Sequence, residues 1–375
     1  MVVLPHNEEV DVRTFERILD LNNMTTSYKL YWFLGIFKEI INGNQELDFR
    51  RIVSRMVACS WYSLVEYHLN FGAVDKLNEL VLYIYNEYDI ETDINENTLL
   101  DFLEHVNDDK MERKYKDFYK YVPFRLLQPF FSDKLVGMKD YLKNKVTEDL
   151  SNQDPDVLYR IDSKAEKIYI NQKWFNYIYQ NQNIINGWLN YKLIYYLQKK
   201  NPNVPAIPFK LSAPGQRDLT NAKQFWENIV KIANIRDIYI NKSFTEENFY
   251  QYGELSIDHF IPWSFVRHDE LWNLVPTFKN VNSSKSNRLP ILNRYLNLFC
   301  DVQYEAFNTA RVQKTNRKFL EDYLTINKKL NFKDINKPEY KIPKPVFVDS
   351  LKSTINPLFQ IAYNQGYEVW SYKLV

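Results

Sequence analysis

Residues 255–290 read LSIDHFIPWSFVRHDELWNLVPTFKNVNSSKSNRLP. Asp258 and His259 are adjacent, Asn273 follows fourteen positions after His259, and Asn282 follows nine positions after Asn273. Lys285 comes one helical turn after Asn282. The plain alternative is that His259 is a buried histidine in an ordinary hairpin. The flanks of the three polar positions argue against it.

These flanks are IDHFIPW at 257–263, WNLVP at 272–276 and NSSK at 282–285. In order, spacing and flanks, the stretch resembles the HNH (ββα-metal) nuclease motif over about residues 235–300. The resemblance implies two antiparallel strands, an irregular loop between them, a helix, and one divalent ion at the centre. Since neighbours on a regular strand point to opposite faces, the strand is expected to become irregular after His259, as Pro262 permits.

The resemblance also implies a role for each residue. His259 is expected as the general base, and Asn273 as the residue that bonds the loop backbone and fixes the direction of His259. Asp258 and Asn282 are expected as metal ligands, and their hard oxygens suit Mg²⁺ or Mn²⁺. Lys285 is expected on the same helix face as Asn282, in contact with phosphate.

Basic residues gather in the half of the chain that holds the motif. Residues 201–375 carry 23 Lys and Arg against 17 Asp and Glu, whereas residues 1–200 carry 25 against 30. We expect a surface for the backbone of double-stranded DNA, built from Lys279, Lys285, Arg288 and Arg294. For any single one of these except Lys285, a plain solvated charge is the alternative. His268 stays open between a secondary ligand and an exposed loop residue.

Many HNH proteins carry a structural zinc held by two Cys-x-x-Cys pairs. This chain has two cysteines, Cys59 and Cys300, and places Phe278 and Val281 where the second pair is expected. The sequence therefore predicts a module without structural zinc, in which apolar packing takes the place of the metal.

Composition and turn residues divide the chain. Aromatic residues at helical spacing and a low glycine count (8 of 375) predict a mainly α domain over residues 1–200, of regulatory or recognition type. Four prolines within 202–214 predict an extended linker at 201–216. An α+β nuclease domain with the ββα module is expected at 217–330, and a C-terminal extension at 331–375.

Other features bear on location and class. The start of the chain lacks a basic segment followed by an apolar core, and its most apolar run, LYWFLGIF at 30–37, is too short to span a bilayer. We therefore expect a cytoplasmic protein.

The sequence favours a metal-dependent DNA endonuclease with His259 as base, acting as an effector in prokaryotic anti-phage defence. The alternative is a non-catalytic DNA-binding or scaffold subunit of a larger defence or mobile-element complex. Residues 1–200 are expected to offer a surface for a protein partner or activator. Because one HNH site cuts one strand, a homodimer is a possible arrangement.

Overall fold

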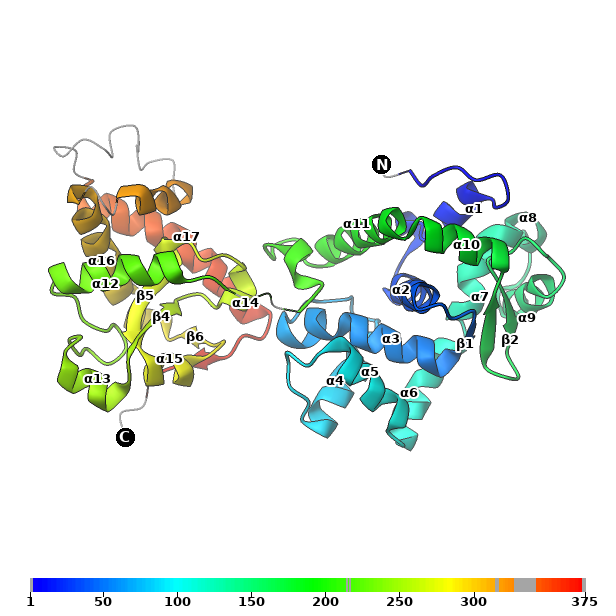
Figure 1. Cartoon of the computed structure of the whole chain (residues 1–375), viewed down its shortest axis with the longest axis horizontal. Helices are drawn as coiled ribbons and strands as arrows, with labels where there is room; N and C mark the ends of the chain where they lie inside the picture. Colours follow the sequence, from blue (N-terminus) through cyan, green and yellow to red (C-terminus); the bar gives the residue numbers. More distant parts are fainter. Residues whose placement is uncertain (1–2, 214, 216, 314–316, 327–341, 373–375) are drawn as a thin grey trace. The chain divides into compact units, whose positions relative to one another are not determined.

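The computed structural model describes residues 3–213, 215, 217–313, 317–326 and 342–372 (Figure 1). The chain divides into two compact units: residues 1–202 with 207–213, and residues 203–206 with 214–375. Most described residues are helical, and the segment around the motif carries small sheets, as the sequence predicted. Among the described helices, none has the length and apolar character needed to cross a membrane.

The first unit is built from helices and one small sheet. Its elements are α1 (Val12–Arg17), η1 (Leu21–Asn23), α2 (Tyr28–Ile41), β1 (Glu46–Asp48), α3 (Phe49–Trp61), η2 (Tyr62–Glu66), α4 (Lys76–Tyr88), α5 (Glu96–His105), α6 (Asp109–Tyr119), α7 (Val122–Leu127), η3 (Gln128–Phe131), α8 (Ser132–Leu135), α9 (Asp140–Ser151), β2 (Tyr159–Asp162), β3 (Lys167–Ile170), α10 (Gln172–Gln180), α11 (Gln182–Lys200) and η4 (Ile207–Lys210).

Helix α2 forms the centre of this unit. Residues 30–37 are all buried, and the helix packs against α3, α7, α10 and α11 (Figure 1). A helix that is apolar on every side is stable only inside a core. Gly35 lies where α2 and α3 approach most closely, because a Cβ there would lie 3.1 Å from the carbonyl oxygen of Ile52. The aromatic stripe of the sequence is therefore core packing.

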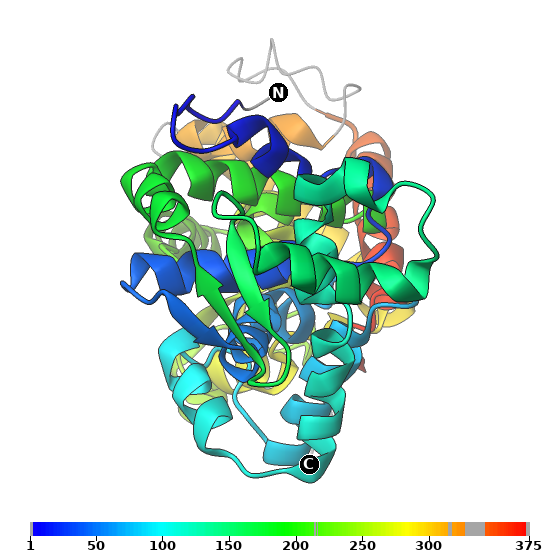
Figure 2. The ribbon, with the colours of Figure 1, turned by 90° about the vertical axis from the view of Figure 1, so that its right-hand side faces the viewer.

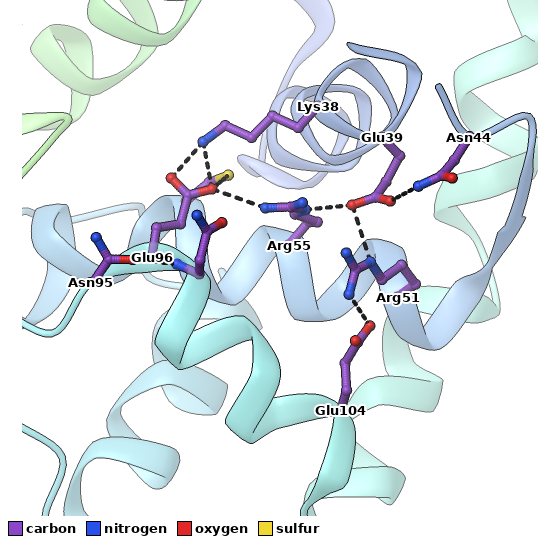
Figure 3. A network of polar contacts seen from close by, with 10 residues as sticks. Lys38, Glu39, Asn44, Arg51, Arg55, Asn95, Glu96 and Glu104 are labelled. Atoms are coloured by element: carbon purple, nitrogen blue, oxygen red, sulfur yellow. Dashed lines mark hydrogen bonds and ion pairs between the residues drawn. The ribbon is translucent and has the colours of Figure 1, made fainter. Parts of the chain in front are cut away.

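A buried ionic network joins α2, α3 and α5 (Figure 3). Glu39, 1% exposed, accepts hydrogen bonds from Arg55 Nε at 2.5 Å and Arg51 Nε at 3.1 Å. Arg55 also lies 3.3 Å from Glu96, which pairs with Lys38 at 2.5 Å. Burial raises the pKa of Glu39, but the bonds from Arg55 and its neighbours outweigh this, so the pKa lies below its ordinary value. The carboxylate is thus held ionised inside the unit.

The small sheet has the order β1–β3–β2, and all its pairs are antiparallel. Figure 2 shows the β2–β3 hairpin in green with β1 in blue beside it. Two helices follow the sheet, α10 and α11, and the break between them lies at Asn181. The proline-rich segment is more than an extended linker, since η4 forms in it and Ile207 is fully buried.

The second unit holds the motif. Its elements are α12 (Thr220–Ile232), α13 (Glu246–Tyr252), β4 (Leu255–His259), α14 (Trp263–Val266), η5 (Leu271–Asn273), β5 (Leu274–Phe278), α15 (Lys279–Lys285), β6 (Leu289–Pro290), α16 (Leu292–Val312), η6 (Arg317–Thr325), α17 (Lys344–Asn364) and β7 (Val369–Trp370).

Strands β4 and β5 pair antiparallel, and α12, α15 and α16 pack on them. The C-terminal segment, expected as an extension, contributes to the same unit. Its strand β7 pairs parallel with β6, and the Trp370 ring contacts that of Tyr239 at 5.2 Å. Residues 237–242 form a turn in which Asp237 accepts from the amides of Tyr239 and Ile240.

Candidate active site

The motif forms a hairpin followed directly by a helix. In the β4–β5 pair, Asp258 lies opposite Val275 and His259 opposite Leu274. Helix α15 begins at the residue after β5 and returns along β4. Its Asn282 Nδ2 donates to Ser256 Oγ at 2.8 Å and to the carbonyl of Ile257 at 3.1 Å. The sequence positions 258, 259 and 282 are therefore brought together by one ββα unit.

Asp258 is 2% exposed, and both carboxylate oxygens accept hydrogen bonds. Oδ1 accepts from Lys285 Nζ at 3.0 Å, and Oδ2 accepts from the Tyr239 hydroxyl. Lys285 Nζ donates further to the carbonyl oxygen of His259 at 2.7 Å. Burial lowers the pKa of Lys285, and Asp258 only partly offsets this. The three side chains form a buried polar cluster beneath His259.

Lys285 therefore lies elsewhere than the sequence suggested. Its side chain is fully buried, with its ammonium group on Asp258 and the backbone of His259, whereas we expected it in contact with phosphate. The reason is the position of Lys285 on α15. One turn after Asn282, it lies on the face of the helix that packs against β4.

His259 is 6% exposed, and its ring is held by a partner that the sequence analysis missed. Its Nε2 donates to Asp269 Oδ1 at 2.7 Å. Nδ1 has no hydrogen-bond partner among the residues that the structure describes. Burial lowers the pKa of His259 below its ordinary value, and Asp269 and Asp258 offset this only in part. The ring is thus neutral at neutral pH, with Nδ1 as the proton acceptor.

Asn273 is fully buried and binds the loop that follows β4. Its Oδ1 accepts from the amide of Ile261 and its Nδ2 donates to the carbonyl of Ile261, both at 2.9 Å. Its own carbonyl accepts from the amide of Phe260 at 2.8 Å. These three bonds fix the chain immediately after His259. Because Asn273 binds the backbone of this loop, we class it as a positioning residue.

A second layer supports this loop from α16. The Gln303 amide donates to the carbonyl of Leu271 at 3.1 Å and to that of Leu274 at 2.6 Å. Tyr323 donates to Gln303 Oε1 at 2.6 Å. Gln303 and Tyr323 are both buried, so the chain on both sides of Asn273 is held by side chains far away in the sequence.

The donor set of Asp258 and Asn282 fits a hard divalent ion such as Mg²⁺ or Mn²⁺, which binds oxygen and keeps several waters. A carboxylate has about four lone-pair sites, so Asp258 retains room beside its two hydrogen bonds. No described residue donates to Asn282 Oδ1. Among the described residues, no three His, Cys, Asp or Glu side chains gather around one point.

The basic residues predicted for nucleic acid lie in different environments. Lys279 is exposed at the start of α15, and Arg294 is exposed with its guanidinium 5.2 Å from the Tyr295 ring. Arg288 is half-buried and donates to the carbonyls of Lys285 and Ser284, which end α15. The structure therefore does not bring the four predicted residues together as one exposed surface.

Two other arginines gather at Trp263, in the loop after β4. The guanidinium of Arg267 lies 3.8 Å from the centre of the indole ring, and that of Arg217 lies 4.9 Å from it. The charge of Arg217 also acts to lower the pKa of His259. Arg217 precedes the motif by about forty residues, and nothing in its local sequence marks it.

Phe278, at a place where other HNH proteins have a zinc-binding cysteine, and His268 both pack against aromatic rings. The Phe278 ring is fully buried and contacts those of Phe244 at 5.0 Å, Tyr252 at 5.5 Å and Phe249 at 5.7 Å. His268 is half-buried, with its ring 5.0 Å from that of Trp272. Burial, together with the neighbouring His259, lowers the pKa of His268 to about 4, so His268 is a neutral packed side chain.

A known protein family matches the segment that forms this site. The model of the HNH endonuclease family matches residues 237–291, which run from the turn at Asp237 to the end of β6. Neither the curated proteins nor the solved structures gave a match to the chain. The family match covers β4, β5, α15 and the loop that holds His259. The segment 237–291 of this chain is therefore a domain of the HNH endonuclease family.

Proposed function

We propose that the second unit hydrolyses phosphodiester bonds of DNA, with His259 as general base. The family match supports a nuclease. The observation that carries the mechanism is the His259–Asp269 hydrogen bond of 2.7 Å beside Asp258 and Asn282. It leaves Nδ1 of a neutral ring as the proton acceptor.

In this mechanism Nδ1 takes a proton from a water molecule. The water oxygen forms a bond to phosphorus, and the bond from phosphorus to the 3′-oxygen breaks. The departing 3′-oxygen takes a proton from solvent, so the products are a 3′-hydroxyl end and a 5′-phosphate end. Asn273 keeps the loop backbone in place, and Asp269 keeps the ring in the tautomer with the free Nδ1. A divalent ion bound at Asp258 and Asn282 would supply charge for the developing negative oxygens.

The direct test is cleavage of single-stranded and double-stranded DNA by the purified chain, with Mg²⁺ or Mn²⁺ and with EDTA. We expect hydrolysis that requires the ion and leaves 3′-hydroxyl ends. Cleavage that is unchanged in EDTA, or no cleavage with any ion, would contradict the proposal.

Asp269 is part of the proposal as a positioning residue. Asp269→Asn keeps the size of the side chain but removes its negative charge, so it no longer favours a charged His259. We expect the cleavage rate to fall roughly 10- to 100-fold, as for other residues that orient a catalytic group. Since a carboxylate raises the pKa of a neighbouring histidine, its loss should move the acidic limb of the pH–rate profile to lower pH.

The matched control for this variant is Asp349→Asn, which changes an exposed aspartate in α17 of the same unit. Its rate and pH profile should equal those of the wild type. If Asp269→Asn also leaves both unchanged, the hydrogen bond to His259 has no role in catalysis.

We further propose that Arg217, which is exposed and whose charge acts on His259, contacts the DNA backbone next to His259. Arg217→Gln should weaken DNA binding at low salt and reduce the slope of log K against log salt by about one, because one phosphate contact is lost. Fluorescence anisotropy with a labelled duplex, over a series of salt concentrations, measures both quantities.

Arg294→Gln is the matched comparison for this prediction, because it removes another exposed arginine that lies over an aromatic ring in the same unit. A reduced slope in Arg294→Gln with an unchanged slope in Arg217→Gln would favour the surface predicted from sequence over the one proposed here.

One observation favours the alternative of a non-catalytic DNA-binding or scaffold subunit: both oxygens of Asp258 already accept hydrogen bonds from the protein. The cleavage assay separates the two, since a scaffold binds DNA and leaves it intact. A role as an effector in prokaryotic anti-phage defence belongs to the same proposal and rests on the resemblance alone. A nucleotide cyclase, ATPase or Argonaute-like gene beside this one would support that role.

A further inference from the structure

The first unit contains a cavity of about 770 Å³, within the range of small-molecule sites. Several elements converge on it: the end of α1, the start of α2, helix α7, the turn η3 and the loop before α9. It belongs to none of the chemistry described for the second unit.

More basic than acidic side chains line the cavity. Four basic side chains line it: Arg17, Lys29, Arg125 and Lys143. Arg125 and Lys143 both pair with Asp140, at 2.9 and 3.8 Å.

The other two lining carboxylates are also engaged. Asp117 pairs with Lys76 at 2.8 Å, and Asp20 accepts from the amide of Asn22 at 3.1 Å. Lys29 has no ion pair or hydrogen bond with any described residue, and Arg17 has only a bond to Ser132 Oγ at 3.3 Å. Neither cation forms an ion pair in the described part of the chain, and the charges of Asp20 and Asp11 act on Lys29 and Arg17 from nearby.

Lys29 is half-buried, and burial lowers the pKa of its ammonium group; the nearby charge of Arg125 lowers this pKa further, and the charge of Asp20 offsets part of the shift. A half-buried cation beside a second cation is unfavourable unless an anion joins them. The unbound protein therefore holds Lys29 in a position that an anionic ligand would stabilise.

The start of α2 adds to this positive field. Thr25, Thr26, Tyr28 and Lys29 line the cavity, and no side chain caps the first turn of the helix. The free amides at a helix start carry partial positive charge and bind anions. The amide of Ser27, just before α2, already donates to Asp75 at 2.7 Å, so the first turn offers the amides after it.

We propose that this cavity binds a small molecule carrying one or more phosphate groups, with Lys29 and Arg17 as its principal contacts. Phosphate matches the observations because it accepts from guanidinium, ammonium, amide and hydroxyl donors together. The lining also includes apolar side chains such as Met24, Leu135 and Val136, which leave room for an organic part such as a nucleoside.

Isothermal titration calorimetry on the purified full-length chain tests the proposal, with sodium pyrophosphate and AMP as probes at constant ionic strength. The wild type should bind at least one probe with a dissociation constant below about 1 mM. Lys29→Met and Arg17→Gln should each weaken binding roughly 10- to 100-fold, the effect of losing a charged hydrogen bond. The control Lys199→Met changes an exposed lysine of the same unit that lies outside the cavity, and should bind like the wild type.

Tighter binding of AMP supports a nucleotide ligand, and equal binding of pyrophosphate supports recognition of the phosphate alone. No saturable binding of either probe overturns the proposal, as does equal weakening in Lys199→Met. If Lys29→Met fails to fold by circular dichroism, Arg17→Gln decides, because Arg17 is exposed. Nuclease activity is not measured, so the result is independent of the function proposed for the second unit.

Discussion

His259→Ala should slow metal-dependent cleavage of DNA by roughly 10²- to 10⁴-fold, the contribution of a general base that is held in place. The reason is geometric: Nε2 is fixed on Asp269, and Nδ1 is the nitrogen left to accept a proton. Since burial lowers the pKa of His259, the wild type should stay active at pH values slightly below the ordinary histidine pKa of 6.5 and lose rate at lower pH, where the ring becomes protonated. Initial rates on a plasmid substrate, over a pH series, measure both effects.

His268→Ala is the matched control. It removes the other histidine of the same loop, which is half-buried against Trp272 and has no contact with Asp258 or Asn282 in the described structure. We expect a rate within about threefold of the wild type, because this ring gives no proton acceptor to the site. Equal residual cleavage in the wild type and His259→Ala, across metals and salt, would remove His259 from the mechanism.

Lys285→Met should lower the free energy of unfolding by about 3–5 kcal/mol, because it leaves the Asp258 carboxylate buried without its cation. Methionine has nearly the length of lysine, so packing is largely kept. Urea unfolding followed by circular dichroism measures the loss. Cleavage should fall as well, since Lys285 also holds the carbonyl of His259.

Lys279→Met gives the comparison, because Lys279 is exposed at the other end of the same helix. Its effect on stability should stay within about 0.5 kcal/mol. If Lys285 were instead a surface contact for phosphate, Lys285→Met would leave stability unchanged, weaken DNA binding and reduce the slope of log K against log salt. That pattern would show that Lys285 leaves Asp258 when the protein is at work.

Local sequence was enough for several elements. The resemblance of the motif implied a strand that ends near Asp258 and His259, and β4 is found at Leu255–His259. The apolar run at 30–37 predicted a packed helix, because a helix with no polar side must be buried. Residues 237–242 include β-branched and aromatic residues typical of a strand, yet they form a turn, because Asp237 accepts from the amide of Tyr239 and from the distant Thr277 hydroxyl.

The sequence by itself determined the family and the chemical types of the site: an imidazole, a carboxylate and two amides at fixed spacing. It did so because these residues lie within one ββα unit, where spacing along the chain sets position. Only the tertiary structure decided which partners they have. Tyr239 and Asp269 reach Asp258 and His259 from loops, and Gln303 supports the loop from α16. Lys285 turned inward because a buried carboxylate attracts the nearest cation, and the direction in which a helix presents its side chains is set by packing, which no local pattern records.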